Sequence, residues 1–213
     1  MYIPAHFAVR DDLAPLYDLI ESHAFGLLLC TRDDGGIEAS HVPFLLDRPG
    51  SVAAAGAQGR LLCHLAAANG QAALLDGRPV TCIFQGPHGY VSPRWYQKKP
   101  AVPTWNYAVV HVHGRANVTR EAGALRDMVD RLSKVYEPAE GGWQLGDEPA
   151  TFVDAMLRGI VGVEIAIERL EGKFKLSQNR PGDIPGVLAA LRDLGGDANA
   201  ALADAMDRAA PRK

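Results

Sequence analysis

The amino-acid sequence predicts an α+β fold in which a β-barrel carries peripheral helices. Between Phe25 and about Val118, short apolar runs alternate with Gly, Pro and Asp-Gly signals, as expected for a series of strands. Helical patterns bracket this region and do not follow every strand, which disfavours a parallel doubly wound sheet. The sequence also lacks GxGxxG and GxxxxGK[ST], the motifs of two common nucleotide-binding folds.

A first helix is predicted to begin near Asp11 or Asp12, because acidic residues there precede the apolar positions Leu16, Leu19 and Ile20. The strand region that follows is interpreted as a β-meander. Its runs are FGLLLCT, IEASHVPFLL, RLLCHL, PVTCIFQG and YAVVHVHGRANV. The sequence DDGG at residues 33–36 predicts a hairpin turn, because Gly and Asp tolerate the positive φ values of tight strand connections.

A short helix is predicted around Ala66 to Leu75, where the chain is Ala-rich, and its N-terminal amides would suit an anion. A longer amphipathic helix is predicted at about Glu121 to Tyr136. Its apolar positions are Leu125, Met128, Val129, Leu132 and Val135.

The polar stretch Glu137 to Pro149 is predicted to be a loop, followed by a helix at Ala150 to Arg158. The alternating segment after it predicts another strand. One face of that strand carries Val161, Val163, Ile165 and Ile167. Two helical segments separated by DLGGD then form a C-terminal extension at about 184–210, within a single domain of residues 1–213.

The composition fits a folded protein, with 47% hydrophobic residues among 213. The net charge of −3 and the lack of a long basic run argue against a strong nucleic-acid footprint. Cys30, Cys63 and Cys82 lie in apolar runs without CxxC spacing and are expected to be small buried hydrophobes. A signal peptide and long apolar segments are missing, so we expect a soluble cytoplasmic protein.

Aromatic and histidine residues are concentrated between Gln85 and Gly114, a composition that suits either a pocket for a planar ligand or an interface. His111 and His113 are two residues apart in a predicted strand and so share a face. A third metal ligand could come from His41, His64 or His88 only if folding gathers them, and we expect no metal site. Nucleophilic catalysis is not indicated, since Ser92 precedes Pro93 in a predicted turn.

The segment Lys173 to Asp183 combines cations with amide side chains after the last strand. Such groups suit a phosphate, although a solvated loop with a turn at Pro181 and Gly182 explains them as well.

Seven blocks of the sequence, taken together and in order, resemble the PaiB family of FMN-binding negative transcriptional regulators. The blocks are MYIPAHF, FGLLL, ASHVPFLLD, IFQGPHGYVSPRWY, VPTWNYAVVHVHG, GIVGVEI and KLSQNR, and the match runs from Met1 to about Met206. The resemblance implies a split β-barrel of the flavin-binding type shared with pyridoxamine phosphate oxidases. It also implies a homodimer with FMN in the cleft between subunits.

The resemblance implies three groups of cofactor-binding residues. Those expected against the flavin ring are Ser40, His41, Val42 and Pro43. Those expected near the phosphate are His64, Ala66, Ala67, Ala68 and Asn69. Those expected to close the pocket, from the other subunit, are Trp105, Asn106, Tyr107, Lys175, Ser177, Gln178, Asn179 and Arg180.

The chain departs from the family where the family commonly reads HxAxxNPxW. Here the sequence is HLAAANGQA, with Gly70 and Ala72 in place of Pro and Trp. These replacements could loosen the loop over the flavin phosphate or alter the adjacent pocket.

The resemblance favours a negative transcriptional regulator, which would contact promoter DNA or a regulatory protein. The sequence contains no recognisable helix-turn-helix, so direct DNA binding would need a basic face. The best candidates for it are Arg120, Arg126, Arg131 and Lys134. The alternatives are an FMN-dependent oxidoreductase that uses a reduced nicotinamide and a small acceptor, and an FMN carrier without turnover.

Overall fold

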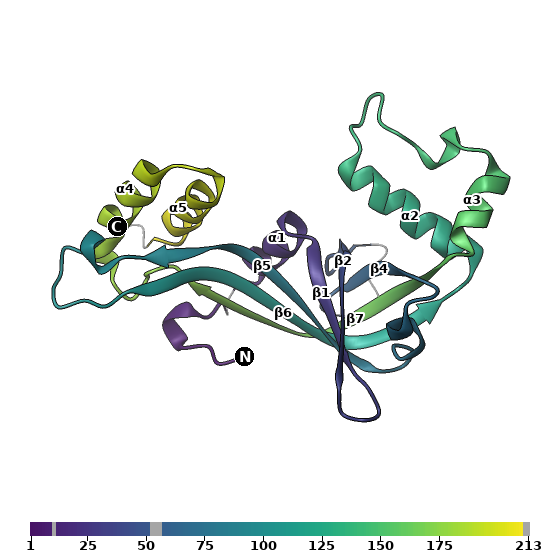
Figure 1. The fold of residues 1–213 in the computed structure, drawn as a ribbon, viewed down its shortest axis with the longest axis horizontal. Helices are drawn as coiled ribbons and strands as arrows, with labels where there is room; N and C mark the ends of the chain where they lie inside the picture. The colour runs from purple at the N-terminus through teal and green to yellow at the C-terminus, as the bar shows by residue number, and fades with distance from the viewer. Residues whose placement is uncertain (10–11, 52–56, 211–213) are drawn as a thin grey trace. The chain divides into compact units, whose positions relative to one another are not determined.

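The computed structural model describes residues 1–9, 12–51 and 57–210 (Figure 1). The strands are β1 (Phe25–Thr31), β2 (Ile37–Pro43), β3 (Leu45–Asp47), β4 (Arg60–Ala66), β5 (Pro79–Val91), β6 (Thr104–Thr119) and β7 (Ile160–Lys175). The α-helices are α1 (Ala14–Ser22), α2 (Ala122–Tyr136), α3 (Ala150–Leu157), α4 (Ile184–Leu194) and α5 (Asp197–Ala209). Short 3-10 helices are η1 (Ala5–Phe7), η2 (Gly70–Ala73), η3 (Pro93–Trp95), η4 (Leu145–Asp147) and η5 (Pro181–Asp183).

The first helix begins slightly later than predicted. Asp11 lies outside the described residues, and α1 starts at Ala14, whose N–H donates a hydrogen bond of 2.9 Å to Asp12 Oδ1. The acidic residue therefore satisfies an N–H group at the start of the helix, as acidic residues in this position commonly do.

The predicted hairpin at residues 33–36 is confirmed. β1 and β2 pair antiparallel with Leu28 opposite Ser40. Gly35 has a φ of 82°, a conformation that glycine adopts without strain, and Asp34 Oδ1 accepts a hydrogen bond of 2.8 Å from the Gly36 N–H.

The β-meander interpretation is wrong. The seven strands form one sheet in the order β2-β1-β5-β6-β7-β4-β3, so β3 and β4 lie beside β7 and not between β2 and β5. β4 pairs antiparallel with β7, with Cys63 opposite Val163. β4 keeps its sequence neighbour β3 on one side and pairs on its other side with β7, where the apolar side chains of both strands, such as Leu61 and Ile165, are buried.

The predicted run IEASHVPFLL forms two strands instead of one. The break falls at Phe44, whose N–H donates to the Ala24 carbonyl and whose ring packs edge-on against Phe84 at a centroid distance of 5.2 Å. Pro43, which has no N–H to donate, immediately precedes it. Burial of Phe44 therefore turns the chain, and β3 continues on the other side of the sheet order.

The predicted helix at Ala66 to Leu75 is also wrong in extent. Ala66 still belongs to β4, and only the four residues of η2 are helical. The turn between them is closed by a hydrogen bond from the Asn69 N–H to the Ala66 carbonyl, and Asn69 Oδ1 then caps η2 by accepting from the Gln71 N–H. Local capping by Asn69 delays the helix start, because asparagine favours cap positions over helix interiors.

The chain divides into two compact units. Unit 1 comprises residues 1–19, 85–110 and 171–213, and unit 2 comprises residues 20–84 and 111–170. Strands β5, β6 and β7 contribute residues to both units. The expectation of a single domain over residues 1–213 stays a prediction.

Unit 1 contains the predicted C-terminal extension as the helix pair α4 and α5 (Figure 1). Its core is formed by apolar side chains of these helices together with Val91, Tyr96 and Leu176. The two predicted helices are thus confirmed, and their apolar faces are buried against the ends of β5 and β7.

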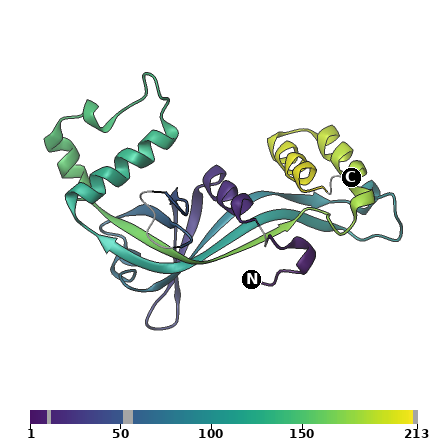
Figure 2. The same cartoon turned by 180° about the vertical axis from the view of Figure 1, so that it is seen from behind.

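Unit 2 contains α2 and α3, which lie beside each other (Figure 2). The predicted α2 helix is confirmed, with Glu121 as its N-cap, although Val135 at its end is 54% exposed. Strands β2 and β4 of this unit contact each other although four strands separate them in the sheet order. This contact shows that the sheet curls until β2 approaches β4, while β2 remains a terminal strand of the hydrogen-bonded order.

Further sequence expectations are met within the described ranges. The four apolar residues predicted on one face of β7 are all buried. The three cysteines are buried and form no disulfide. Among the helices of the described residues, none is long and apolar enough to cross a membrane.

Candidate functional site

The predicted site residues fall into two groups, one in each compact unit. Unit 2 holds residues 40–43, His64 and residues 66–69, while unit 1 holds residues 105–107, Lys175 and residues 177–180. Each group is described separately.

In unit 2, the structure brings together Ser40 and Asn69, which the resemblance assigned to the ring and phosphate groups. Asn69 Nδ2 donates a hydrogen bond of 3.1 Å to Ser40 Oγ. The adjacent Gln71 is 1% exposed, and its Nε2 donates to the carbonyls of Leu28, at 3.0 Å, and Glu38, at 3.3 Å. We call Ser40, Asn69 and Gln71 the Ser40 cluster.

The Ser40 cluster lies at an edge of the sheet. β2 is terminal in the strand order, so among the described strands only β1 pairs with it. The outer edge of such a strand presents backbone N–H and C=O groups to a ligand or partner. Val42 is buried, whereas His41 is exposed and stacks on Phe25 at a centroid distance of 6.1 Å.

Two buried polar atoms of unit 2 lack a hydrogen-bond partner within the described part of the chain. They are Gln71 Oε1 and His64 Nδ1. Burial also lowers the pKa of His64, because desolvation disfavours the charged imidazolium. Burial therefore favours the neutral imidazole of His64, in which one ring nitrogen donates a hydrogen bond and the other accepts one.

The three alanines predicted near a phosphate differ in what their amides can offer. Ala66, Ala67 and Ala68 are exposed. The Ala67 N–H already donates to the Gly159 carbonyl at 2.8 Å. The expected set of helix N-terminal amides is therefore smaller than the sequence indicated, since η2 begins only at Gly70.

In unit 1, Asn106 and Ser177 are brought together but are core residues. Asn106 is 1% exposed, and its Nδ2 donates to Ser177 Oγ at 2.8 Å and contacts Met206 Sδ at 3.3 Å. Ser177 has a φ of 69°, which holds this hydroxyl at the end of β7. The pair supports the fold from inside, and Asn106 Oδ1 has no partner among the described residues.

Lys175 is partly buried and is fixed by hydrogen bonds within unit 1. Its Nζ donates to Thr104 Oγ1 and to the Trp105 carbonyl. Burial, reinforced by repulsion from Lys173, lowers the pKa of Lys175. The Gln178 side chain stabilises the turn in which it lies, because its Oε1 accepts a hydrogen bond of 2.7 Å from the Leu176 N–H.

Among the predicted site residues of unit 1, Trp105 remains accessible. Trp105 is 54% exposed and stacks on His88 at a centroid distance of 6.2 Å. Lys173 Nζ lies 5.5 Å from the centre of the Tyr107 ring. Ser92 caps η3 by accepting from the Arg94 N–H, which confirms its turn role.

Asn179 and Arg180 line a pocket of about 610 Å³ in unit 1. The pocket is formed by two segments, Gln97–Pro100 and Asn179–Asp183, and we call it the Arg180 pocket. Lys98 and Lys99 of this pocket were not predicted as site residues, although the two adjacent lysines in YQKKP indicate a local positive charge. Gln71, which no local pattern marks as buried, was also not predicted.

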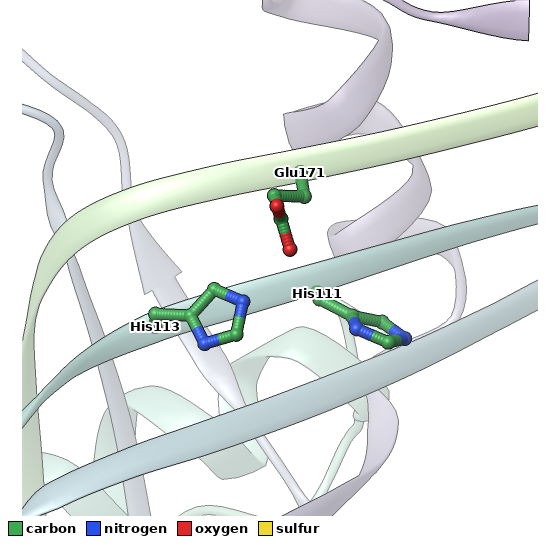
Figure 3. Close-up of side chains that lie close together, drawn as sticks. All are labelled: His111, His113 and Glu171. Carbon is green, nitrogen blue, oxygen red and sulfur yellow. The ribbon is translucent and has the colours of Figure 1, made fainter. Parts of the chain in front are cut away.

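His111 and His113 share a face of β6, as predicted (Figure 3). Their ring centroids are 6.3 Å apart with an interplanar angle of 67°. His113 Nδ1 lies within hydrogen-bond distance, 3.1 Å, of Thr81 Oγ1. Glu171, also labelled in Figure 3, belongs to β7 and to unit 1.

The sequence of residues 1–169 matches a protein family described as "Putative FMN-binding domain". The chain is 34% identical to an uncharacterised protein of Emericella nidulans over 96% of this chain and 95% of the relative. It is 31% identical to "Protease synthase and sporulation protein PAI 2" of Bacillus subtilis, over 84% of this chain and 83% of the relative.

Among solved structures, the fold is similar to that of the flavocytochrome Anf3 from Azotobacter vinelandii. The TM-score is 0.57 at 12% identity, covering 81% of this chain and 72% of that one. Together with the curled antiparallel sheet, this similarity confirms the α+β split-barrel fold class.

Proposed function

Because the chain belongs to the PaiB-type family of FMN-binding proteins, we propose that it acts as an FMN-responsive negative regulator of transcription. FMN is the cofactor of the family, and its ring supplies one- and two-electron transfer when bound. The name of the Bacillus subtilis relative, a protease synthase and sporulation protein, supports a regulatory role.

The observation that carries the FMN assignment is the Ser40 cluster on the edge strand β2. The backbone of residues 40–43 can pair with the polar edge of a flavin ring. Asn69 fixes the Ser40 hydroxyl, and the buried Gln71 Oε1 and His64 Nδ1 remain available to hydrogen-bond donors or acceptors. These residues fit a polar, planar cofactor with a phosphate.

A titration of the apoprotein with FMN, followed by flavin fluorescence, tests this assignment. We expect saturable binding and a rise of about tenfold in Kd for Asn69→Ala, which frees Ser40 and uncaps η2. The matched control is Asn199→Ala, whose amide bonds the Gly195 carbonyl in unit 1 and which should bind FMN as the wild type does. Equal Kd values for the two variants would contradict the assignment.

We propose that the protein forms a homodimer in which unit 1 of one copy contributes to the FMN site of the other. Exposed apolar side chains support association, with Phe25 at 68%, Ile37 at 69% and Trp105 at 54% exposure. In this arrangement Trp105 and Tyr107 contact the flavin, while Asn106, Lys175, Ser177 and Gln178 act as positioning residues. Light scattering should give twice the chain mass of 22.9 kDa, whereas a monomer with bound FMN would refute the dimer.

The proposed regulator acts by binding a regulatory protein in preference to promoter DNA. Three of the four cations suggested for a DNA-binding face of α2 are paired with carboxylates. Arg126 pairs with Asp154 at 2.6 Å, Lys134 with Asp130 at 2.6 Å, and Arg131 with Asp47. Neutralised cations release few phosphate counterions and so contribute little to DNA affinity.

A second candidate, which needs no DNA-binding face, is an FMN-dependent oxidoreductase using a reduced nicotinamide and a small acceptor. Stimulated NADH oxidation by the FMN-loaded protein would support this candidate. Salt-sensitive retention of genomic DNA fragments would support direct regulation, and FMN-dependent capture of a defined transcription factor would support regulation through a protein.

A further inference from the structure

The Arg180 pocket of unit 1 carries an excess of positive charge. Its charged lining residues are Lys98, Lys99, Arg180 and Asp183, which give a formal charge of +2. Within the described residues, neither lysine forms a salt bridge, and Lys99 Nζ instead donates to the Pro93 carbonyl. Both lysine side chains are exposed at the pocket.

The single carboxylate of the pocket is already committed to the fold. Asp183 is 3% exposed, and its Oδ1 accepts from the backbone N–H groups of Gln97, at 2.9 Å, and Lys98, at 3.0 Å. Its Oδ2 accepts from Arg180 Nε at 2.6 Å. Burial alone would raise the pKa of Asp183, but these hydrogen bonds outweigh burial and lower it.

Arg180 is held in place before any ligand arrives. Its Nη2 donates to the Lys98 carbonyl at 2.9 Å, and its Cζ lies 4.5 Å from the centre of the Tyr96 ring. With the bond to Asp183, these contacts use two of the five guanidinium N–H groups. The remaining donors belong to a preorganised cation, which loses little conformational entropy on binding an anion.

A second pocket with a charged lining behaves differently. It lies in unit 2, has a volume of about 330 Å³, and is lined by Arg60, Arg131, Asp127 and Glu164 among others. Arg60 pairs with Glu164 at 2.7 Å and Arg131 with Asp127 at 3.7 Å, so its cations are balanced. Unlike this pocket, the Arg180 pocket carries more cations than carboxylates.

We propose that the Arg180 pocket binds the phosphate monoester group of a small molecule other than FMN. Lys98, Lys99 and Arg180 supply the charge, and the Asn179 amide is a further donor of the lining. The volume of about 610 Å³ lies within the range of about 300–1,000 Å³ typical of small-molecule sites, so the pocket also accommodates the body of the ligand. This site does not rest on the proposed regulatory function.

Calorimetric titration of the full chain with inorganic phosphate tests the proposal, at constant ionic strength set with chloride. The test variant is Lys98→Gln, because the exposed Lys98 side chain forms no hydrogen bond or salt bridge within the described residues and its loss should leave the fold intact. The matched control is Lys134→Gln, an exposed lysine on α2. Lys99→Gln provides a second test variant.

We expect saturable phosphate binding both with and without saturating FMN, weakened about tenfold or more by Lys98→Gln and unchanged by Lys134→Gln. Absence of binding, or equal weakening in both variants, overturns the proposal. A third outcome also overturns it: phosphate competes with FMN, and Lys98→Gln weakens FMN but not riboflavin. In that case the pocket holds the phosphate of FMN itself, and the FMN assignment survives while the second ligand does not.

Discussion

Gly70 occupies a position where a proline fits the backbone of this chain. It is the first residue of η2, where proline is favoured, and Asn69 before it is extended with φ −69° and ψ 121°. A Cβ added at Gly70 would meet no atom within 4 Å, and its N–H donates to no acceptor among the described residues. Gly70→Pro should therefore stabilise the protein by about 0.4–1 kcal/mol in urea unfolding, by restricting the unfolded chain.

The control for this substitution is Gly77→Pro. Gly77 has a φ of 71°, which proline cannot adopt, and its N–H donates to the Ala116 carbonyl at 2.8 Å. This variant should lose more stability than Gly70→Pro gains. Destabilisation by Gly70→Pro would show that the native loop needs the flexibility of glycine.

His64 should make stability depend on pH in the acidic range. Burial lowers its pKa in the folded state below the ordinary value of about 6.5, so the unfolded chain binds more protons below that pH. The stabilising contribution is complete above about pH 6.5 and is lost as the pH falls toward the folded-state pKa. NMR titration should place the pKa of His64 below 6.5, and a value at or above 6.5 would contradict the effect of burial.

For individual residues, the sequence predicted which side chains belong to the candidate site better than it predicted their hydrogen-bond partners. Ser40 and Asn69 were predicted by resemblance and prove to be bonded to each other. Gln71 was missed because the residue type is ordinarily exposed, and only the folded strands provide the carbonyls that it bonds. Asn106 and Ser177 were predicted as ligand contacts, and their mutual bond inside the core depends on residues 71 positions apart.

Helix α2 is attached to the strands of unit 2 by a partly buried ion network. Asp47 of β3 is 6% exposed and accepts from Arg60 at 2.8 Å and from Arg131 of α2. Desolvation alone would lower the pKa of Arg60, but its carboxylate partners outweigh it and raise the pKa. Asp47→Asn removes the carboxylate between two guanidinium groups and should cost about 3 kcal/mol in unfolding free energy.

Lys134→Gln on the same helix is the control, because the Lys134–Asp130 pair is exposed and spaced i, i+4. It should cost no more than about 0.5 kcal/mol. If Asp47→Asn costs no more than this control, the network does not anchor α2.

The elements that were predicted correctly are those with strong local signals. The DDGG turn, the apolar spacing of α2 and the alternation of β7 each specify local geometry. The order of the strands was not predictable in this way, because the pairing of β4 with β7 joins residues about a hundred positions apart. The helix at residues 66–75 was overextended because alanine propensity is weak compared with the cap made by Asn69.

For the whole molecule, hydrogen exchange should separate the two proposed sites. FMN should slow exchange in residues 38–43 and 66–71 of unit 2, where the Ser40 cluster lies. Phosphate should slow exchange in residues 97–99 and 179–183 of unit 1. Protection of residues 97–99 by FMN alone would assign the Arg180 pocket to the cofactor.

Some features of the whole molecule were predictable from the sequence and others were not. Family resemblance correctly predicted the flavin-binding fold class and FMN. The division into two compact units, with a separate apolar core around α4 and α5, has no signal in composition, since residues 85–110 and 171–213 are distant in sequence. Charge was similarly hidden: a chain with a net charge of −3 contains a pocket with a charge of +2.

The buried Gln71 has a consequence for how this loop can be redesigned. Its Nε2 donates to the carbonyls of Leu28 and Glu38, one from each strand of the β1–β2 hairpin. This one side chain therefore fixes the loop after β4 to the hairpin. Gly70 and Ala72, where the sequence departs from the motif HxAxxNPxW, lie directly on either side of Gln71. New residues can therefore be introduced by design on either side of Gln71, while its side chain holds the loop in place.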